Sequence, residues 1–135
     1  MASGISAKLP LSIDPDDGIS LNKTYRDVAR QNLINLLLTI PGERIMIPDF
    51  GVGMKMFLFE NDTSALRSQI HSNITSQVSK YLPYIQIEKI NFQSFSENEL
   101  MDRNMLSINI IYKVVPLGTI DEITLNSKND DIVIL

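Results

Sequence analysis

The stretch from Arg30 to Glu60, RQNLINLLLTIPGERIMIPDFGVGMKMFLFE, decides the fold of this chain. Its first part has the pattern of an amphipathic helix, because apolar residues recur at three- and four-residue spacing and fall on one side of a helix. We expect this face to be buried, and we expect the helix to begin near Tyr25, because Thr24 and Asp27 have the spacing of a capping box. The face consists of Ala29, Leu33, Leu36, Leu37 and Ile40.

An ordered loop is predicted after this helix. The step from Pro41 to Gly42 ends the helix, because a residue before proline avoids helical geometry and glycine tolerates the left-handed turn after a helix. We expect Glu43 and Arg44 to point outward and Phe50 to point inward. The loop either packs the helix against the rest of the domain or contacts a partner, and both alternatives stay open. Its structural motif consists of Pro41, Gly42, Pro48, Asp49, Phe50 and Gly51.

An apolar patch and a second amphipathic helix follow the loop. The patch serves as core or as a contact surface, and we expect core; it consists of Met54, Met56, Phe57, Leu58 and Phe59. N-cap candidates stand at residues 61–64, and Pro83 ends the helix. The buried stripe is predicted to consist of Leu66, Ile70, Ile74 and Val78, with Tyr81 or Leu82 continuing it.

Beyond this proline the hydrophobic period changes from 3.6 to 2, which predicts strands. The phase changes between Ile87 and Ile90, which implies a β-bulge near Glu88 and Lys89. We expect a hairpin loop over residues 94–104, a clear strand over residues 106–114 and a short third strand within residues 120–125. Two amphipathic helices packed on a small, mainly antiparallel sheet make an α+β fold.

The two ends of the chain are predicted to differ from its middle. Residues 1–22 have the weak alternation and the turn signals of an extended arm, and residues 23–125 form a single α+β domain. The polar stretch at 126–131 is expected to be solvated, and an apolar tetrad then ends the chain: Ile132, Val133, Ile134 and Leu135. This tail, residues 126–135, either completes the sheet of its own domain or adds as a strand to another chain.

Composition excludes several classes of function. A net charge of −4 argues against binding to nucleic acid or to an anionic membrane surface, since both need a basic face. The chain has no cysteine, so it has neither a disulfide nor a thiolate metal site, and we expect no cofactor. It has one histidine, His71, which we expect at the surface or its boundary. No apolar run is long enough to span a bilayer, and we expect no signal peptide.

One family shows the same motifs in the same order. The series QNL, LLLT, PGER and PDFG over residues 31–51, followed by LFEN at residues 58–61, resembles the baseplate wedge family of contractile-tailed bacteriophages. Type VI secretion and tailocin baseplates have related proteins. The resemblance covers roughly residues 28–125.

The resemblance implies a structural role. Proteins of this family sit in each of six wedges around the baseplate hub, and their fold is similar to the core of the tail sheath subunit. They join the wedge to the first sheath ring and offer strand edges from which the sheath starts to assemble. The implied partners are other wedge proteins, the sheath protein, and hub or tube proteins. The implied location is the virion tail baseplate, reached from the host bacterial cytoplasm.

The resemblance also points to interface residues. Many relatives carry Glu-Pro-Arg where the second helix meets the next strand, and this motif docks the protein on other wedge subunits. Here Leu82, Pro83 and Tyr84 stand instead, so the partner differs or the contact is apolar. We expect partner contacts at Pro83 and Tyr84, at the terminal tetrad, and as a charged contact at Glu43 and Arg44.

A catalytic function is the alternative that needs testing, because some members of the family have carried a lysozyme label. Glycoside hydrolysis needs two carboxylates across a cleft, and the candidate pairs are Glu43 with Asp49 and Glu60 with Asp62. The chain has no tryptophan for a sugar platform, and a salt bridge is the commoner role for Glu43. We therefore expect no enzyme, with a small cell-wall hydrolase or a generic protein-binding domain as alternatives.

Overall fold

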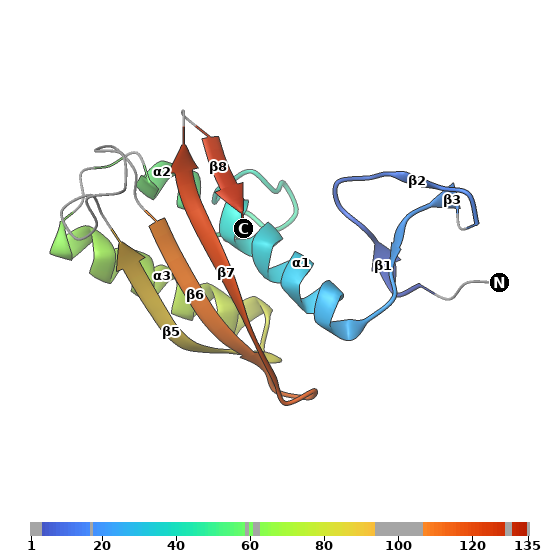
Figure 1. The fold of residues 1–135 in the computed structure, drawn as a ribbon. Helices are drawn as coiled ribbons and strands as arrows, with labels where there is room; N and C mark the ends of the chain where they lie inside the picture. Colours follow the sequence, from blue (N-terminus) through green and yellow to red (C-terminus); the bar gives the residue numbers. More distant parts are fainter. Residues whose placement is uncertain are drawn as a thin grey trace.

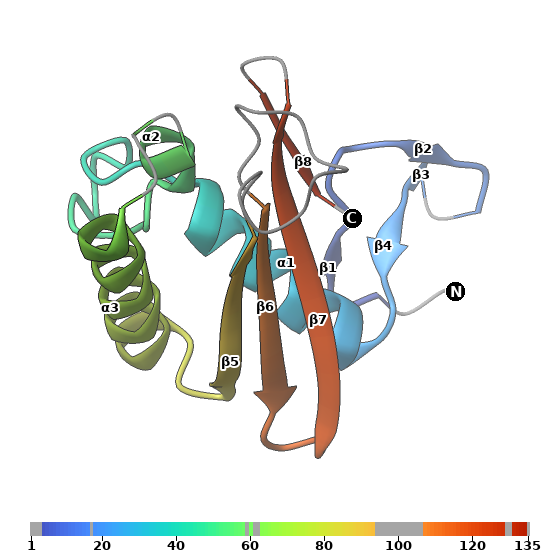
Figure 2. The same ribbon diagram turned by 60° about the vertical axis from the view of Figure 1, so that its left-hand side comes forward.

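Two long helices lie against one face of a four-stranded antiparallel sheet (Figures 1 and 2). The computed structural model describes residues 4–16, 18–58, 60, 63–93, 107–128 and 131–134. Among the described residues, nineteen apolar side chains from the helices, the intervening loop and the sheet form one core. The α+β architecture predicted from the sequence is confirmed.

Helix α1 spans Tyr25–Leu38 and begins where the sequence predicts. The hydroxyl oxygen of Thr24 accepts a hydrogen bond from the backbone N–H of Asp27, and this bond caps the first turn. The predicted face is buried at Ala29, Leu33, Leu36 and Leu37. The helix ends earlier than expected, at Leu38, because the Thr39 backbone turns to an extended conformation; Ile40 therefore belongs to the loop.

Helix α3 spans Ser64–Tyr81, and Thr63 is its N-cap. Its buried residues are the predicted ones: Leu66, Ile70, Ile74 and Val78. A five-residue helix, α2 (Met54–Leu58), precedes it. The expectation that the apolar patch is core holds for Met54, which is fully buried, and is wrong for Met56, whose exposed fraction is 57%. Successive residues of a helix point in different directions around its axis, so Met54 faces the core while Met56 faces solvent.

The sheet consists of β5 (Ile85–Gln93), β6 (Ser107–Val114), β7 (Thr119–Lys128) and β8 (Asp131–Ile134), in this order. The predicted bulge is confirmed, because the register of β5 against β6 shifts between Ile87 and Lys89. On β6, Ile108, Ile110, Tyr112 and Val114 are buried. The expected hairpin loop at residues 94–104 lies outside the described residues.

Strand β7 is longer than predicted. The polar residues at 126–128 continue the strand rather than leaving it for solvent, because β8 supplies backbone partners for them. Asn126 also accepts a hydrogen bond from the buried Ser107 hydroxyl at 2.6 Å. Backbone pairing thus holds a polar sequence in a strand that its composition alone does not predict.

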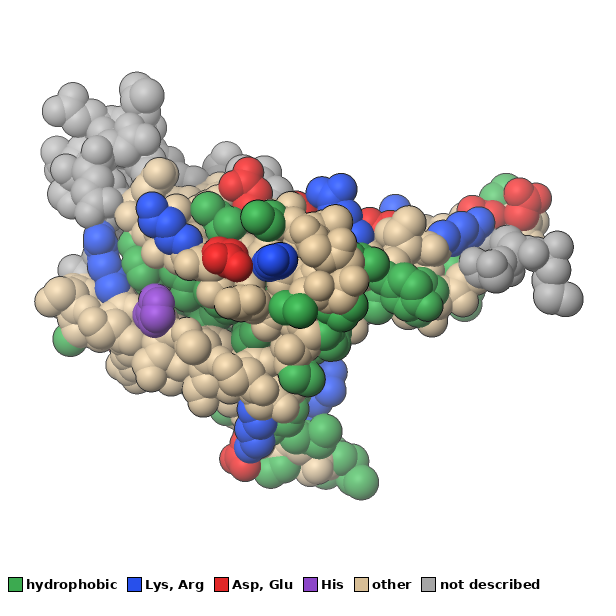
Figure 3. Space-filling view, turned by 90° about the horizontal axis from the view of Figure 1, so that it is seen from below, with side chains coloured by type: hydrophobic (Ala, Val, Ile, Leu, Met, Phe, Trp, Pro, Cys, Tyr) green, Lys and Arg blue, Asp and Glu red, His purple; other side chains and the backbone are tan. Residues whose placement is uncertain are grey.

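The N-terminal arm folds back on itself and projects from the domain (Figure 1). Strand β1 (Ser6–Ala7) pairs with β4 (Leu21–Asn22), and β2 (Ile13–Asp14) pairs with β3 (Gly18–Ile19). Figure 3 shows hydrophobic side chains along this projection. Ile13 at its tip is 91% exposed.

The side chain of Gln31 fixes the arm to α1. Its amide nitrogen donates to the Ala7 carbonyl at 3.0 Å, and its amide oxygen accepts from the Leu9 N–H at 3.0 Å. The same oxygen accepts from the buried Asn22 side chain at 2.8 Å. One helical residue therefore gives the arm a defined position.

Candidate functional site

The loop between Pro41 and Gly51, named the motif loop below, is closed by its own backbone. The Gly42 N–H donates to the Pro48 carbonyl at 2.7 Å, and the Phe50 N–H donates to the Ile47 carbonyl at 3.2 Å. Gly42 has a φ of +91°, a conformation that glycine adopts without strain. The motif loop is therefore a folded element and not a linker, as the sequence predicts.

Glu43 and Arg44 point outward, as expected, and both are exposed. The Glu43 carboxylate accepts a hydrogen bond from the Ile40 N–H at 3.0 Å. The Arg44 guanidinium lies 4.0 Å from the centroid of the Phe50 ring, which is a cation–π contact. Within the described part of the chain no ion pair joins Glu43 to Arg44. Both residues thus have a local role, and their contact with a partner stays a prediction.

Phe50 and Gly51 attach the motif loop to the core. The Phe50 ring is 8% exposed and meets the Tyr81 ring edge-on, with centroids 5.0 Å apart. Gly51 has a φ of +115°, and a Cβ atom there would lie 2.1 Å from the Thr39 carbonyl oxygen. Only glycine fits this close approach to the end of α1.

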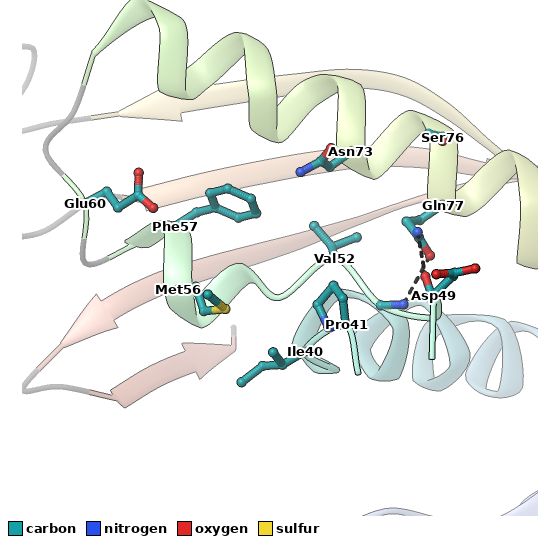
Figure 4. Close-up of a pocket in the computed structure, with 11 residues that line it drawn as sticks. Ile40, Pro41, Asp49, Val52, Met56, Phe57, Glu60, Asn73, Ser76 and Gln77 are labelled. Atoms are coloured by element: carbon teal, nitrogen blue, oxygen red, sulfur yellow. Dashed lines mark hydrogen bonds between the residues drawn. The ribbon is translucent and has the colours of Figure 1, made fainter. Parts of the chain in front are cut away.

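Gln77 on α3 is a site residue that the sequence reasoning missed. Its amide oxygen accepts from the Gly51 N–H at 3.1 Å, and its amide nitrogen donates to the Asp49 carbonyl at 2.9 Å (Figure 4). A glutamine beside the apolar stripe of a helix carries no pattern that would reveal this role.

A cavity of about 470 Å³ lies between the motif loop, α2 and α3 (Figure 4). Ile40, Val52 and Phe57 contribute apolar surface to it. The carboxylates of Asp49 and Glu60 lie at opposite ends of the cavity.

Of the two carboxylate pairs proposed from the sequence, the cavity does not contain Glu43 with Asp49, and the pair of Glu60 with Asp62 is described only at Glu60. Glu43 does not line the cavity, and Asp62 lies outside the described residues.

His71 is on the surface, as expected, and Figure 3 shows it there. No group of acidic residues and histidine among the described residues is arranged to hold a metal ion. Among the described residues, no helix combines the length and the apolar character needed to cross a membrane.

The tip of the motif loop exposes apolar side chains. Ile45 is 94% exposed and Met46 is 91% exposed, although the loop that carries them is held by the bonds described above. The order of this loop therefore comes from its backbone and from Phe50, and not from burial of the Ile45–Ile47 run.

The other predicted contact residues lie at two places. Leu82 is buried, Pro83 is exposed, and the Tyr84 hydroxyl accepts a hydrogen bond from the Asn32 side chain at 2.9 Å. Ile132, Val133 and Ile134 belong to β8, whose backbone pairs with residues 125–128 of β7. Leu135 lies outside the described residues. In the single chain the tail thus completes the sheet of its own domain, which is one of its two predicted alternatives. Its addition as a strand to another chain stays a prediction.

An ionic cluster that the sequence did not reveal joins α1 to β7. Arg26 contacts the Asp121 carboxylate at 3.2 Å, Arg30 lies 3.7 Å from it, and the Tyr112 hydroxyl donates to it at 3.3 Å. Burial alone would raise the pKa of Asp121, but the hydrogen bonds and charges from Arg26 and the Glu122 N–H hold it below its usual value. Burial, followed by the Asp121 charge, raises the pKa of Tyr112 to about 12.

The chain is similar to the proteins of one known family. The family described as baseplate wedge protein gp25 matches residues 23–116, which include the motif loop, both long helices and β6. The chain belongs to this baseplate wedge family. It is 33% identical over 92 residues to baseplate wedge protein gp25 of Enterobacteria phage T4, covering 62% of this chain and 67% of that protein.

Solved structures agree with the assignment. The chain is similar to a chain in the baseplate of the anti-feeding prophage, with a TM-score of 0.68, 31% identity, and coverage of 82% of this chain and 84% of that one. A Geobacter sulfurreducens protein described as a tail lysozyme has a TM-score of 0.63 at 21% identity, covering 80% and 94%. A chain of the postcontracted pyocin R2 baseplate has a TM-score of 0.51 at 14% identity, covering 87% and 96%. The similarity to these last two chains shows only that they share the fold.

This protein is a baseplate wedge component of a contractile tail or a related particle. The matched family and the phage T4 relative carry the name of a structural baseplate protein, whereas one structural neighbour is described as a tail lysozyme; the absence of enzyme activity stays a prediction.

Proposed function

We propose that this wedge protein joins the baseplate to the first ring of the tail sheath and initiates sheath assembly by strand addition. It would do so from six-fold symmetric positions, with other wedge proteins, the sheath protein, and hub or tube proteins as its partners. Host cytoplasm would be its location before assembly. The observation that supports this proposal is the short edge strand β8 at the end of the sheet.

Backbone pairing at this edge is incomplete. Strand β8 pairs with residues 125–128 of β7, whereas β7 begins at Thr119, so residues 119–124 have no partner strand on the side opposite β6 within the described chain. An incoming strand can pair beside β8, so β8 is the edge that it needs. Strand addition uses backbone hydrogen bonds, and it tolerates varied side chains in the donor.

Docking on the wedge would use a different surface. A cavity of about 410 Å³ is lined by Val78, Pro83, Ile85 and Val115, among others. The walls at this place are largely apolar, and the Tyr84 hydroxyl is already bonded to Asn32. We infer an apolar contact with another wedge protein here, where many relatives carry the charged Glu-Pro-Arg motif.

Affinity capture from cells that assemble the parent particle tests the proposal. Residues 131–135 are deleted, which removes β8 and leaves the whole of β7 in place. The matched control replaces Ile132 and Ile134 by Val, so that a β-forming apolar tail is retained. We expect the deletion to lose the sheath protein while other baseplate proteins are still captured, and the control to keep both. Sheath recovery that is equal in all three proteins would overturn the proposal.

A cell-wall hydrolase is the second candidate, because Asp49 and Glu60 line one cavity. It predicts that the isolated protein clears peptidoglycan and that Glu43→Gln, Asp49→Asn or Glu60→Gln reduces the clearing. We expect no clearing by the parent protein, tested beside a lysozyme standard. Clearing that is lost in any of these variants would establish the hydrolase.

A further inference from the structure

The cavity beside the motif loop has the chemistry of a docking groove. Its apolar surface comes from Ile40, Pro41, Val52, Met56 and Phe57. Met56 is 57% exposed at the groove, although it stands next to the buried stretch from Phe50 to Met54. A thioether side chain adapts to the shape of a partner, which makes methionine common on binding surfaces.

The charges of the groove have one sign. Asp49 and Glu60 are both exposed, and they lie at its two ends (Figure 4). Neither carboxylate has an ion-pair partner in the described part of the chain. The described residues that line the groove include no Lys, Arg or His. An occupant that is apolar in the middle and positively charged at both ends would complement this pattern.

The groove is also held in shape before any partner binds. Gln77 bonds the backbone of Asp49 and Gly51, while the Val52 N–H donates to the Leu36 carbonyl at 3.0 Å and the Gly53 N–H to the Thr39 carbonyl at 2.9 Å. The wall formed by the motif loop is therefore fixed to both α1 and α3. A preformed groove binds a partner with a smaller loss of conformational entropy.

We propose that this groove binds a short segment of another baseplate protein that carries aliphatic residues between two basic residues. The basic side chains pair with Asp49 and Glu60, and the aliphatic residues lie on Val52, Met56 and Phe57. This surface shares no residue with the β7–β8 edge, so the inference goes beyond the proposed initiation of the sheath.

Site-specific photo-crosslinking in cells that assemble the particle tests this proposal. Met56 is replaced by p-benzoylphenylalanine, and the crosslinked peptide is identified by mass spectrometry. We expect one segment of a baseplate protein, with Lys or Arg on both sides of an aliphatic run. The double variant Asp49→Asn with Glu60→Gln is expected to lower the crosslink yield about fivefold, the effect of losing two solvent-exposed ion pairs.

The matched control is Glu88→Gln, which removes an exposed carboxylate on β5, away from the groove. We expect this variant to leave the yield unchanged. A captured segment without basic residues, an equal yield in the double variant, or no capture in assembled particles would each overturn the proposal. All variants keep β8, so recovery of the sheath protein reports separately on the proposed initiation.

Discussion

The side-chain amide of Gln77 accepts a hydrogen bond from the backbone N–H of Gly51, 26 residues away in the sequence, at 3.1 Å. The same amide also donates a hydrogen bond to the Asp49 carbonyl. It therefore gives the backbone of the motif loop the donor and the acceptor that a neighbouring strand would otherwise supply. The loop with the family's motif is thus positioned by a helix residue outside that motif.

Loss of this amide should destabilise the protein. Gln77→Ala leaves the Gly51 N–H and the Asp49 carbonyl without their partners, and we expect the free energy of unfolding to fall by about 1–3 kcal/mol. Urea denaturation measures the change. Ser79→Ala, an exposed substitution on the same helix, should change it by less than about 0.5 kcal/mol. Equal values for the two variants would show that the amide does not support the loop.

Gly51 should not tolerate a side chain. A Cβ atom at this position would lie 2.1 Å from the Thr39 carbonyl oxygen, and the backbone has a positive φ. We expect Gly51→Ala to cost about 3 kcal/mol or more, because backbone strain and a steric clash add. Gly118→Ala is the control: its φ is +65° with no atom within 4 Å, so only the strain of about 1 kcal/mol applies. Thermal unfolding of the two variants separates the clash from the strain.

The ionic cluster at Asp121 should make stability depend on acid pH. The folded state lowers the pKa of Asp121 below its ordinary 3.8, so its contribution is fully present above that value. The contribution is lost as the pH falls below about 4, toward the folded pKa. We expect Asp121→Asn to be less stable than the parent near neutral pH and to approach it below about pH 4. A difference between the two proteins that stays constant down to about pH 3 would contradict this assignment.

Gln31 should determine how firmly the N-terminal arm is held, without changing the stability of the domain. Gln31→Ala removes the hydrogen bonds to Ala7, Leu9 and Asn22, and we expect faster amide hydrogen exchange over residues 5–22. Exchange in α3 and β6 should stay unchanged, because Gln31 is outside the buried core. Gln86→Ala, an exposed substitution on β5, is the control. Unchanged exchange in the arm would mean that other contacts hold it.

The periodic elements could be predicted from the sequence because their signal is local. Side-chain period predicts the buried residues of α1 and α3 and the bulge between Ile87 and Lys89. Turn and capping chemistry predicts the N-cap Thr24 and the inward Phe50. The motif residues from Pro41 to Gly51 also indicated the family, since their order is unusual. Each of these features depends on residues within a few positions of one another.

What only the tertiary structure decided depends on residues far apart in the chain. Gln77 and Asp121 carry no local pattern, because the partners that join them to another element, Gly51 for Gln77 and Arg26 for Asp121, lie 26 and 95 residues away. The exposure of Ile45 and Met46 and the strand conformation of residues 126–128 likewise depend on which surfaces meet. A hydrophobic period fixes which face of an element is buried, whereas polar side chains take partners that only the packed fold brings within hydrogen-bond distance.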